Sequence, residues 1–465
     1  AVCHIADLEE KRKMSILSWL KGAICKLFDT NELAAKMQTL PADKDMTEAV
    51  RLWAECYRCT PPWAVADSNV RCLNLPYSVA HEMARLVTLE LNSELTGSPR
   101  ADHLSDAYSQ AVAMSPVWVE YACALGGVFL KPYVSGGKIY TDIIQADAAA
   151  VSGYDGDNIT ECVFADRIVR KGRYFTRLEK HSLTGTNYTV VNKAYVSDSS
   201  AQIGREIALG AVAEWADIAP SATFSGIKRP LFVYMKMPGA NIIDRRSPLG
   251  VSVFNAAIST IEEADMQFTR GIWEFEGSEL AVYADVTAVQ RGNDGTETAP
   301  KFNRRLIKTL DFNQDQAFNV FSPQIREEAQ RNGLNNLLRQ IERQCGLAFG
   351  TLSEVQDTDK TATEIKASKQ RSYATVSAIQ ANVRKALTEF VQVLDMLCDI
   401  HELAPRGACE QSFDFDDSLV TDSETEQKIW LQEVSAGIMS PVEYRMKRYG
   451  ETEEQAAAML PESFE

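Results

Sequence analysis

The first quarter of the chain carries apolar residues at helical spacing. In the stretch PYSVAHEMARLVTLELNSEL these positions follow at intervals of 4, 3, 1 and 4 residues, namely Val79, Met83, Leu86, Val87 and Leu91. That period is typical of an amphipathic helix. With the stretch SPRADHLSDAYSQAVAMS, it predicts helices over residues 41–125, after a helix with a break in residues 1–40.

The period changes to that of β-strands between Gly126 and Val196. Short stretches rich in β-branched and aromatic residues, such as GKIYTDIIQ and ITECVFADRIV, are separated by turns such as RKG and LTGTN. This pattern predicts an antiparallel β unit. A further strand is predicted from Pro230 to Met237.

Two long helices then enclose a predicted β insert. The first has Ser247 as its N-cap and Pro248 as its first residue, and one polar residue, Asp265, interrupts its apolar stripe. The second repeats the Ser-Pro start at Ser322 and Pro323. Between them, SELAVYADVTAV and KFNRRLIKTLDF predict strands joined by the polar segment QRGNDGTETAP.

A third helix is predicted to be the longest. Thr361 and Glu364 form a T-x-x-E capping box, and no glycine or proline occurs between Thr351 and Ala404. About 40 residues at 1.5 Å each predict a rod of roughly 60 Å. Its apolar stripe includes Val383, Leu387, Phe390 and Leu394.

Polar segments lie on both sides of this helix. The loop before it, GLAFGTLSEVQDTDK, has two glycines near its start and an acidic second half. Pro405 and Gly407 end the helix. The C-terminal segment predicts three short helices with capping motifs, at Ser423 with Glu426, Ser440-Pro441 with Glu443, and Thr452 with Gln455.

Composition and charge narrow the class of protein. The 465 residues are 45% hydrophobic and 24% charged, as in ordinary soluble globular proteins, and carry a net charge of −16. An acidic chain is unsuited to wrapping nucleic acid on a basic surface. The charged start does not resemble a secretory signal, and no apolar run is long enough to span a membrane. Ten cysteines without regular spacing favour reduced thiols.

Few motifs indicate metal or thiol chemistry. Cys56 and Cys59 form a C-x-x-C pair, but Cys72 follows thirteen residues later and no second pair completes a zinc site. Ordinary thiols are therefore the favoured interpretation. Asp414, Asp416 and Asp417 alternate with phenylalanine in FDFDDS, which fits either a divalent-cation site or the solvated edge of a strand.

Two other stretches have both a functional and a structural interpretation. Ser18 to Phe28 is amphipathic and could lie on a membrane, although a helix that packs on the core gives the same pattern more often. The paired glycines between Ala124 and Gly137 lack any phosphate-binding spacing, so turns are favoured there. No catalytic constellation and no cofactor site are predicted.

The order of elements suggests assembly. A helix–β–helix piece this long and thin cannot bury its own faces, but a closed ring of copies would bury them through head-to-tail contacts. The chain resembles portal proteins of long-tailed bacteriophages from about Leu73 to Pro461. The stretches that carry the resemblance are LNLPYSVAHEMARLV, ALGGVFLKPYV with GKIYTDIIQAD, NIIDRRSPLGVSVFNAAISTIEEAD, GLAFGTLSEVQDTDKTATEI and VSAGIMSPVEYR.

The resemblance implies an α+β portal-type fold with named parts. The helical and β-stranded wing would comprise residues 1–246 and the long spine helix 361–405. The other parts would be the stem helices at 247–275 and 322–345, the clip at 276–321, the tunnel loop at 346–360 and the crown at 406–465.

It also implies a function without catalysis. A homo-dodecamer at one capsid vertex would pass double-stranded DNA and bind the terminase large subunit, the head–tail adaptor, and the major capsid and scaffolding proteins. It would assemble in the host bacterial cytoplasm, become part of the virion, and need neither a membrane nor a cofactor. Twelve copies would carry about −192 charges, which repel phosphate.

Three sets of residues would carry this function. The mobile tunnel loop would present Glu354, Val355, Gln356, Asp357, Asp359 and Lys360 to DNA, and the tip of the clip would present Arg291, Asn293, Asp294 and Glu297 to the adaptor or terminase. The spine would contact neighbouring subunits through Val383, Leu387, Phe390 and Leu394.

Two alternatives belong to other classes of protein. One is a cytosolic oligomeric enzyme or scaffold with no recognisable active site, and the other is a membrane-peripheral scaffold that uses residues 18–28. An annular particle in a negative-stain image would favour the ring, a monomer or dimer the enzyme, and pelleting with lipid the peripheral scaffold.

Overall fold

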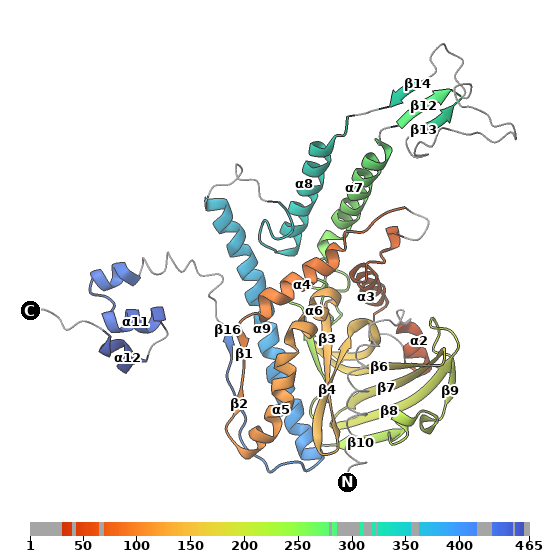
Figure 1. Ribbon diagram of the computed structural model, residues 1–465. Helices are drawn as coiled ribbons and strands as arrows, with labels where there is room; N and C mark the ends of the chain where they lie inside the picture. Colours follow the sequence, from red (N-terminus) through yellow and green to blue (C-terminus); the bar gives the residue numbers. More distant parts are fainter. Residues whose placement is uncertain are drawn as a thin grey trace, which may run out of the picture.

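A computed structural model gives the architecture of the chain (Figure 1). It describes residues 30–39, 43–64, 69–278, 281–285, 307–310, 318–321, 324–354, 362–415, 430–449 and 452–459. Helices and strands form a mixed body, from which two helices extend to a small separate sheet. The α+β class predicted from the sequence is confirmed.

Helices dominate the first part of the body, as the spacing predicted. They are α2 (Thr30–Lys36), α3 (Lys44–Tyr57), α4 (Leu75–Thr88), α5 (Pro99–Ala113) and α6 (Ser115–Leu125), with short 3-10 turns and the two-residue strands β1 (Leu91–Asn92) and β2 (Leu95–Thr96) between them. Asp43 caps α3 by accepting a hydrogen bond from the Met46 amide at 2.9 Å. Ser98 caps α5 in the same way, before a proline in the first turn.

Two antiparallel sheets form the β part of the body. The smaller consists of β3 (Gly127–Ser135), β4 (Lys138–Gln145) and β11 (Val233–Lys236), in the order β11-β3-β4. The larger consists of β5 (Ala149–Asp155), β6 (Asn158–Arg170), β7 (Arg173–Thr184), β8 (Asn187–Ser197), β9 (Arg205–Ile207) and β10 (Ser221–Ser225). The predicted β unit and the later strand are both confirmed.

A buried ionic cluster joins the two sheets. Lys131 of β3 contacts Glu179 of β7, with 2.6 Å between Nζ and Oε2, and His181 Nε2 lies 2.8 Å from Glu179 Oε1. Burial alone would raise the pKa of Glu179, but Lys131, His181 and Arg177 together hold it well below its usual range. The charge of Glu179 is therefore compensated from several sides, as burial requires.

The two helices predicted to form the stem correspond to α7 (Ile258–Gly277) and α8 (Glu327–Cys345), and this pair is called the stem here. The prediction that the first stem helix starts at Ser247 and Pro248 is wrong, because the backbone before Ile258 bonds to the body instead of coiling. The Val253 amide donates to the Cys123 carbonyl at 3.0 Å. A Cβ on Gly250 would lie 2.1 Å from the Gly126 carbonyl oxygen, so two chain segments meet there without room for side chains.

The second stem helix also begins later than predicted. Residues 324–326 are not helical, and the Arg326 amide donates to Glu274 of α7 at 3.0 Å. Ser322 and Pro323, the predicted start, lie outside the described residues. The hydrogen bond from the Arg326 amide to Glu274 therefore lies just before the first residue of α8.

The insert between the stem helices forms a three-stranded sheet. It contains β12 (Ala281–Asp285), β13 (Ile307–Leu310) and β14 (Phe318–Phe321), in the order β13-β12-β14. The two predicted strands are confirmed, but β12 pairs with β13 in parallel, whereas the two strands of a hairpin are antiparallel. Its residues Arg291, Asn293, Asp294 and Glu297 lie outside the described part of the chain.

The longest described helix, α9 (Ala362–Ile400), runs through the body and has 39 residues, close to the predicted length of about 40. Thr361 of the predicted capping box lies outside the described residues. The stripe predicted to contact neighbouring subunits, Val383, Leu387, Phe390 and Leu394, has no exposed surface within the single chain. These side chains pack in the main core with residues of α4, α6 and β3. They have no surface left for a neighbour, which corrects their assignment to a subunit interface.

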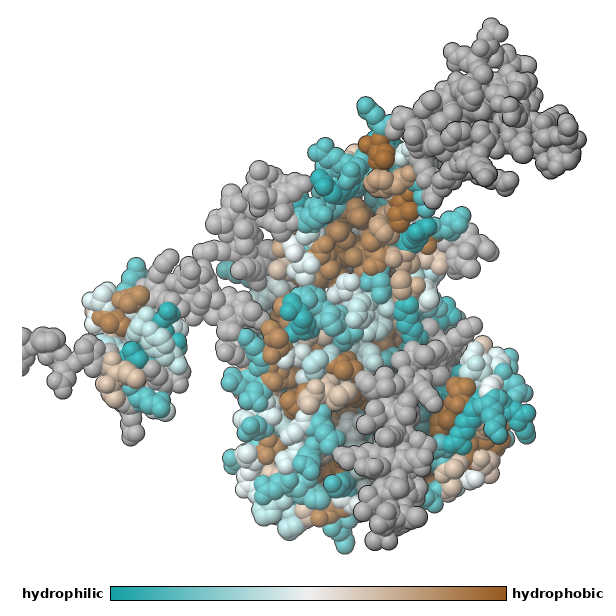
Figure 2. Space-filling view, in the orientation of Figure 1, coloured by the Kyte–Doolittle hydropathy of each residue, from teal (hydrophilic) through white to brown (hydrophobic). Residues whose placement is uncertain are grey.

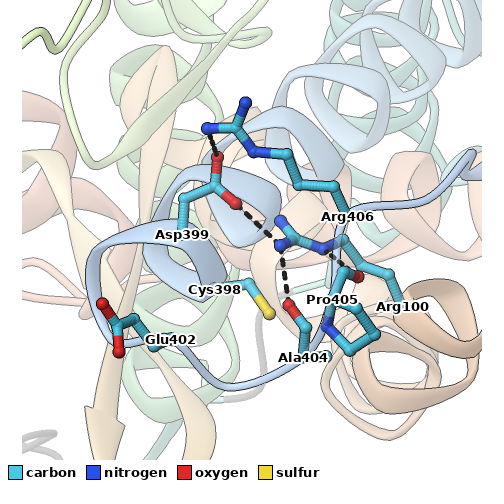
Figure 3. Close-up of a pocket in the computed structure, with 7 residues that line it drawn as sticks. All are labelled: Arg100, Cys398, Asp399, Glu402, Ala404, Pro405 and Arg406. Atoms are coloured by element: carbon cyan, nitrogen blue, oxygen red, sulfur yellow. Dashed lines mark hydrogen bonds and ion pairs between the residues drawn. The ribbon is translucent and has the colours of Figure 1, made fainter.

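Arg100 of α5 fixes the end of α9 (Figure 3). Its guanidinium is 2% exposed and donates to Asp395 Oδ1 at 2.6 Å, to Asp399 Oδ1 at 2.7 Å, and to the carbonyls of Ala404 and Pro405 at 2.8 and 3.0 Å. Bonds to two carboxylates compensate the buried charge. The chain is thereby turned back along the body.

After this turn the chain pairs with the two short strands near α5. The strands β15 (Glu410–Gln411) and β16 (Asp414–Phe415) run antiparallel to β2 and β1. Asp414 is exposed on a strand, as one of its two interpretations predicted, whereas Asp416 and Asp417 lie outside the described residues.

The C-terminal part contains α11 (Pro441–Tyr449) and α12 (Glu453–Ala458), which pack on each other. Thr452 and Gln455 form the predicted capping box. Ser440 Oγ accepts a hydrogen bond from the Glu443 amide at 3.0 Å, also as predicted. Ser423 lies outside the described residues. No described helix is long and apolar enough to cross a membrane.

We predict that Phe390→Ala destabilises the single subunit. Truncation of a fully buried phenylalanine costs about 3–5 kcal/mol, so the midpoint of denaturant unfolding should fall accordingly. Lys385→Ala, on the exposed side of the same helix, is the matched control and should leave the midpoint nearly unchanged. Equal midpoints for both variants would contradict the core assignment.

Candidate functional site

The stem and the segment that follows α8 form the candidate functional region. The predicted tunnel-loop residues follow α8 in the sequence, and the predicted docking residues of the clip lie between α7 and α8. In Figure 1, α7 and α8 run side by side from the body toward β12, β13 and β14. The residues after α8, 346–354, return to the body and are called the loop base here.

Asp265 holds α7 to the N-terminal half of the body. Its carboxylate is buried and accepts hydrogen bonds from Trp63 Nε1 at 2.9 Å and from the Leu73 amide at 2.8 Å. A buried carboxylate is tolerated when donors surround it. The single polar break in the apolar stripe of α7 is therefore an anchor for the stem.

Glu342 plays the same part on α8. It is 1% exposed and accepts hydrogen bonds from the amides of Leu352 at 2.6 Å and Ser353 at 2.8 Å, and from Ser353 Oγ at 2.9 Å. Bonds to an ionised carboxylate are about twice as strong as neutral ones. One side chain thus closes the loop base onto the helix that precedes it.

The loop base is more strongly held than the sequence predicted. Gly346 ends α8 in the left-handed region with φ of 75°, and a Cβ there would lie 2.5 Å from Thr375 Oγ1 of α9. The Asn335 side chain bonds both the amide of Glu354, at 2.8 Å, and its carbonyl, at 3.2 Å. The prediction that the loop is mobile from Gly346 onward is therefore wrong for residues 346–354.

A charged pair closes the outer end of the stem. Arg326 donates from Nε to Glu274 Oε1 at 3.0 Å and from Nη2 to Oε2 at 3.2 Å, and Gln330 donates to Oε2 at 2.7 Å. The hydrogen bonds from the Arg326 side chain and backbone lower the pKa of Glu274 to about 2. A planar bidentate contact of this kind fixes the relative position of α7 and α8.

The two stem helices present different surfaces. Most exposed residues along α8 are polar or charged, with both signs of charge, and include Glu327, Glu328, Arg331, Asn332, Asn336 and Arg343. On α7, by contrast, Trp273 and Phe275 are 69% and 51% exposed. Figure 2 shows brown, apolar surface at the end of the stem beside the residues drawn in grey. Large apolar side chains this exposed at the end of a helix indicate contact with another surface.

The two cysteines of the C-x-x-C motif differ in their exposure to solvent. Cys56 is buried in α3, and burial raises the pKa of its thiol to about 12, whereas Cys59 is exposed. Across the described ranges, no group of three or more His, Cys, Asp or Glu side chains is placed to hold a metal ion.

Only one of the predicted loop residues can be located. Glu354 is exposed at the end of the loop base, and Val355, Gln356, Asp357, Asp359 and Lys360 lie outside the described residues. Sequence reasoning noticed Asp265 but did not assign it a role, and it missed Glu342 entirely. Nothing in the local sequence ERQC distinguishes Glu342 from an exposed glutamate.

The comparisons with known proteins identify a family match. The family model described as "Phage portal protein, SPP1 Gp6-like" matches residues 114–463. No curated protein sequence matches.

Two solved structures are similar at low identity. "Neck of native GTA particle computed with C12 symmetry" has 11% identity and a TM-score of 0.42, and covers 90% of this chain and 98% of the other. "Neck of empty GTA particle computed with C6 symmetry" has 12% identity and a TM-score of 0.44, and covers 90% and 97%.

We predict that Glu342→Gln loosens the loop base while α8 stays folded. The neutral amide keeps the shape but weakens bonds worth about 1.5–3 kcal/mol to a charged acceptor. Hydrogen exchange at the amides of Leu352 and Ser353 should rise by at least tenfold. Glu328→Gln, at an exposed position on the same helix, is the control. Unchanged exchange at both amides would show that the carboxylate does not hold the loop base.

We predict that the contact between Glu274 and Arg326 survives mild acid. Because the folded pKa of about 2 lies below the usual value near 4.3, the contact stabilises the fold fully above pH 4.3 and is lost as pH falls through 2. A carboxyl-carbon NMR titration should give a midpoint near 2 for Glu274. In Arg326→Gln the midpoint should move up toward 4.3. A midpoint near 4.3 in the unaltered chain would refute the contact.

Proposed function

The chain belongs to the SPP1 Gp6-like family of phage portal proteins, and from this premise we propose that it forms a dodecameric ring that conducts double-stranded DNA. The observation that carries the proposal is the family match over residues 114–463, three quarters of the chain. Membership in this family makes it a portal protein and fits a component of the virion. The ring size, the conduit and the partners are our proposal.

The arrangement of the stem supports a tubular assembly. Two helices extend from the body and end in a separate small sheet, so the outer part of each, residues 266–277 and 327–334, has no buried side chain (Figure 1). Helices in this position are stabilised when copies pack around them. We assign residues 276–321 to the clip and residues 406–465 to the crown, at opposite ends of such a ring.

The polarity of α8 supports a water-filled channel beside it. A helix face that borders water is polar, and Arg331, Asn332, Asn336 and Arg343 are exposed on α8. Twelve chains carry about −192 charges in total, which opposes tight binding of DNA to the wall. Arginines along α8 then give weak contacts to phosphate within an otherwise repulsive channel.

We propose that the tunnel loop reaches toward DNA from the loop base. Glu354, Asp357 and Asp359 supply negative charge against Lys360, and Val355 and Gln356 lie between them. Because Glu342 and Asn335 fix the loop base, the approach of the loop to the channel is determined by α8.

The partners follow from the same arrangement. The clip tip, with Arg291, Asn293, Asp294 and Glu297, would bind the terminase large subunit during packaging and the head–tail adaptor afterwards. The wing and crown would face the major capsid and scaffolding proteins at one capsid vertex, after assembly in the host bacterial cytoplasm. Subunit contacts along α9 would use exposed residues such as Lys385 rather than the buried stripe. The portal would catalyse no reaction, and the terminase would supply the ATPase.

The ring itself can be tested directly. Purified full chain should give annular particles in negative stain and a native mass of twelve subunits. A monomer or dimer at all concentrations, with a folded circular dichroism spectrum, would favour the cytosolic enzyme or scaffold. Pelleting with lipid vesicles would favour the peripheral scaffold.

We predict that replacing Glu354, Asp357 and Asp359 by Lys impairs packaging. Each subunit changes by six charge units, so the ring gains about 72, and DNA should bind the loop in a salt-dependent way. Packaged DNA length in particles should fall, while rings still form. A variant with Lys at Asp155, Glu206 and Asp217, three exposed positions of the wing, carries the same charge change as a control. Full-length packaging in the loop variant at normal yield would show that the loop does not face DNA.

A further inference from the structure

The two most exposed aromatic side chains of α7 lie on opposite sides of the helix. Trp273 and Phe275 are 69% and 51% exposed. Residues two positions apart in an α-helix differ by about 200° around the axis, which leaves roughly 160° between these side chains. One helix therefore presents two separate apolar flanks at the outer end of the stem.

Contacts within the chain already involve two parts of α7 near these aromatic residues. Glu274, between the two aromatics, turns toward α8 and binds Arg326 and Gln330. Thr269 lies four residues before Trp273 on the same face of the helix, and its hydroxyl accepts a hydrogen bond from the Arg71 amide at 2.9 Å. The chain therefore covers the α8 side at Glu274, and it covers the Trp273 face at Thr269, one turn before the exposed Trp273.

The Phe275 flank continues a stripe that starts in the core. Ile261, Ala264, Phe268, Ile272 and Phe275 follow one another at spacings of three or four residues. Ile261 and Ala264 are buried, Phe268 and Ile272 are half-buried, and Phe275 is exposed. The apolar stripe therefore extends beyond the part of α7 that the core buries. Trp273 lies on the other flank, seven residues after the half-buried Met266.

We propose that these flanks are the two halves of one head-to-tail contact, in which Trp273 of one subunit packs against Ile272 and Phe275 of the next. The occupant is a second copy of this chain, because a closed ring gives every subunit two neighbours through two different surfaces. A two-fold contact would pair one flank with itself and leave the other bare. Tryptophan in a desolvated pocket often dominates the energy of an interface.

This proposal rests on the ring proposed above and names the residues that close it at the stem. It also places an apolar subunit contact on α7, since the apolar stripe of α9 is buried within its own chain. The polar side of α8, with Asn332 and Asn336, remains free to border the channel.

Disulfide trapping in the full chain tests the pairing. A chain with both Trp273→Cys and Phe275→Cys, oxidised with copper phenanthroline as rings, should give a ladder of covalent multimers on a non-reducing gel. Either single variant should give none. The unaltered chain controls for native thiols such as the exposed Cys59, and Asn332→Cys with Asn336→Cys, on α8, is the matched control pair.

Aspartate substitutions give a second test that does not depend on the thiols. Trp273→Asp and Phe275→Asp should each fold, with unchanged circular dichroism, but reduce the ring fraction at least tenfold. A one-to-one mixture restores one intact contact between unlike subunits, so sedimentation should show dimers in the mixture that neither variant forms alone.

The outcomes separate this proposal from the function on which it rests. Normal rings without a ladder, or rings formed by both aspartate variants, would overturn the stem contact and leave the ring intact. Covalent dimers from a single cysteine variant would show a two-fold contact and also overturn it. Absence of rings from the unaltered chain would instead refute the proposed function.

Discussion

Two buried carboxylates determine how the stem leaves the body. Asp265 on α7 and Glu342 on α8 are almost fully buried, and each accepts hydrogen bonds from chain segments outside the stem. A buried charge is stable only with such donors, so each carboxylate dictates which backbone must lie beside it. The direction of the stem and the path of the loop base both follow from these contacts.

The long helix α9 serves the body more than the assembly. Its apolar stripe lies in the main core, where α9 packs on α4, β3 and β11, and Arg100 fixes its last turn. Because α9 is packed along its length and bound at its end, the body fixes the position of the residues that follow the helix. The loop before α9 and the strands after it are thereby attached to the same rigid element.

Polarity divides the stem between two kinds of neighbour. Polar residues and charged residues of both signs are exposed along α8, whereas α7 exposes Trp273 and Phe275 on opposite flanks. Water or hydrated DNA suits the first surface, and another protein surface suits the second. The pair Glu274–Arg326 keeps the two helices in the register that this division requires.

The sequence by itself determined the elements with local causes. Periodicity located the helices of residues 41–125, the β unit and α9, and the Thr452–Gln455 box was read from its spacing. The start of α7, the burial of the α9 stripe and the role of Glu342 were decided only by the tertiary structure. Each depends on contacts outside its own helix. The Val253 amide binds the Cys123 carbonyl, which keeps residue 253 out of α7. Phe390 is covered by the main core, and Glu342 binds Ser353 across a turn. An apolar stripe indicates that a face of the helix is buried. It does not show whether the same chain or a neighbouring subunit buries it, because the hydrophobic effect depends on the apolar area removed from water and not on which chain removes it.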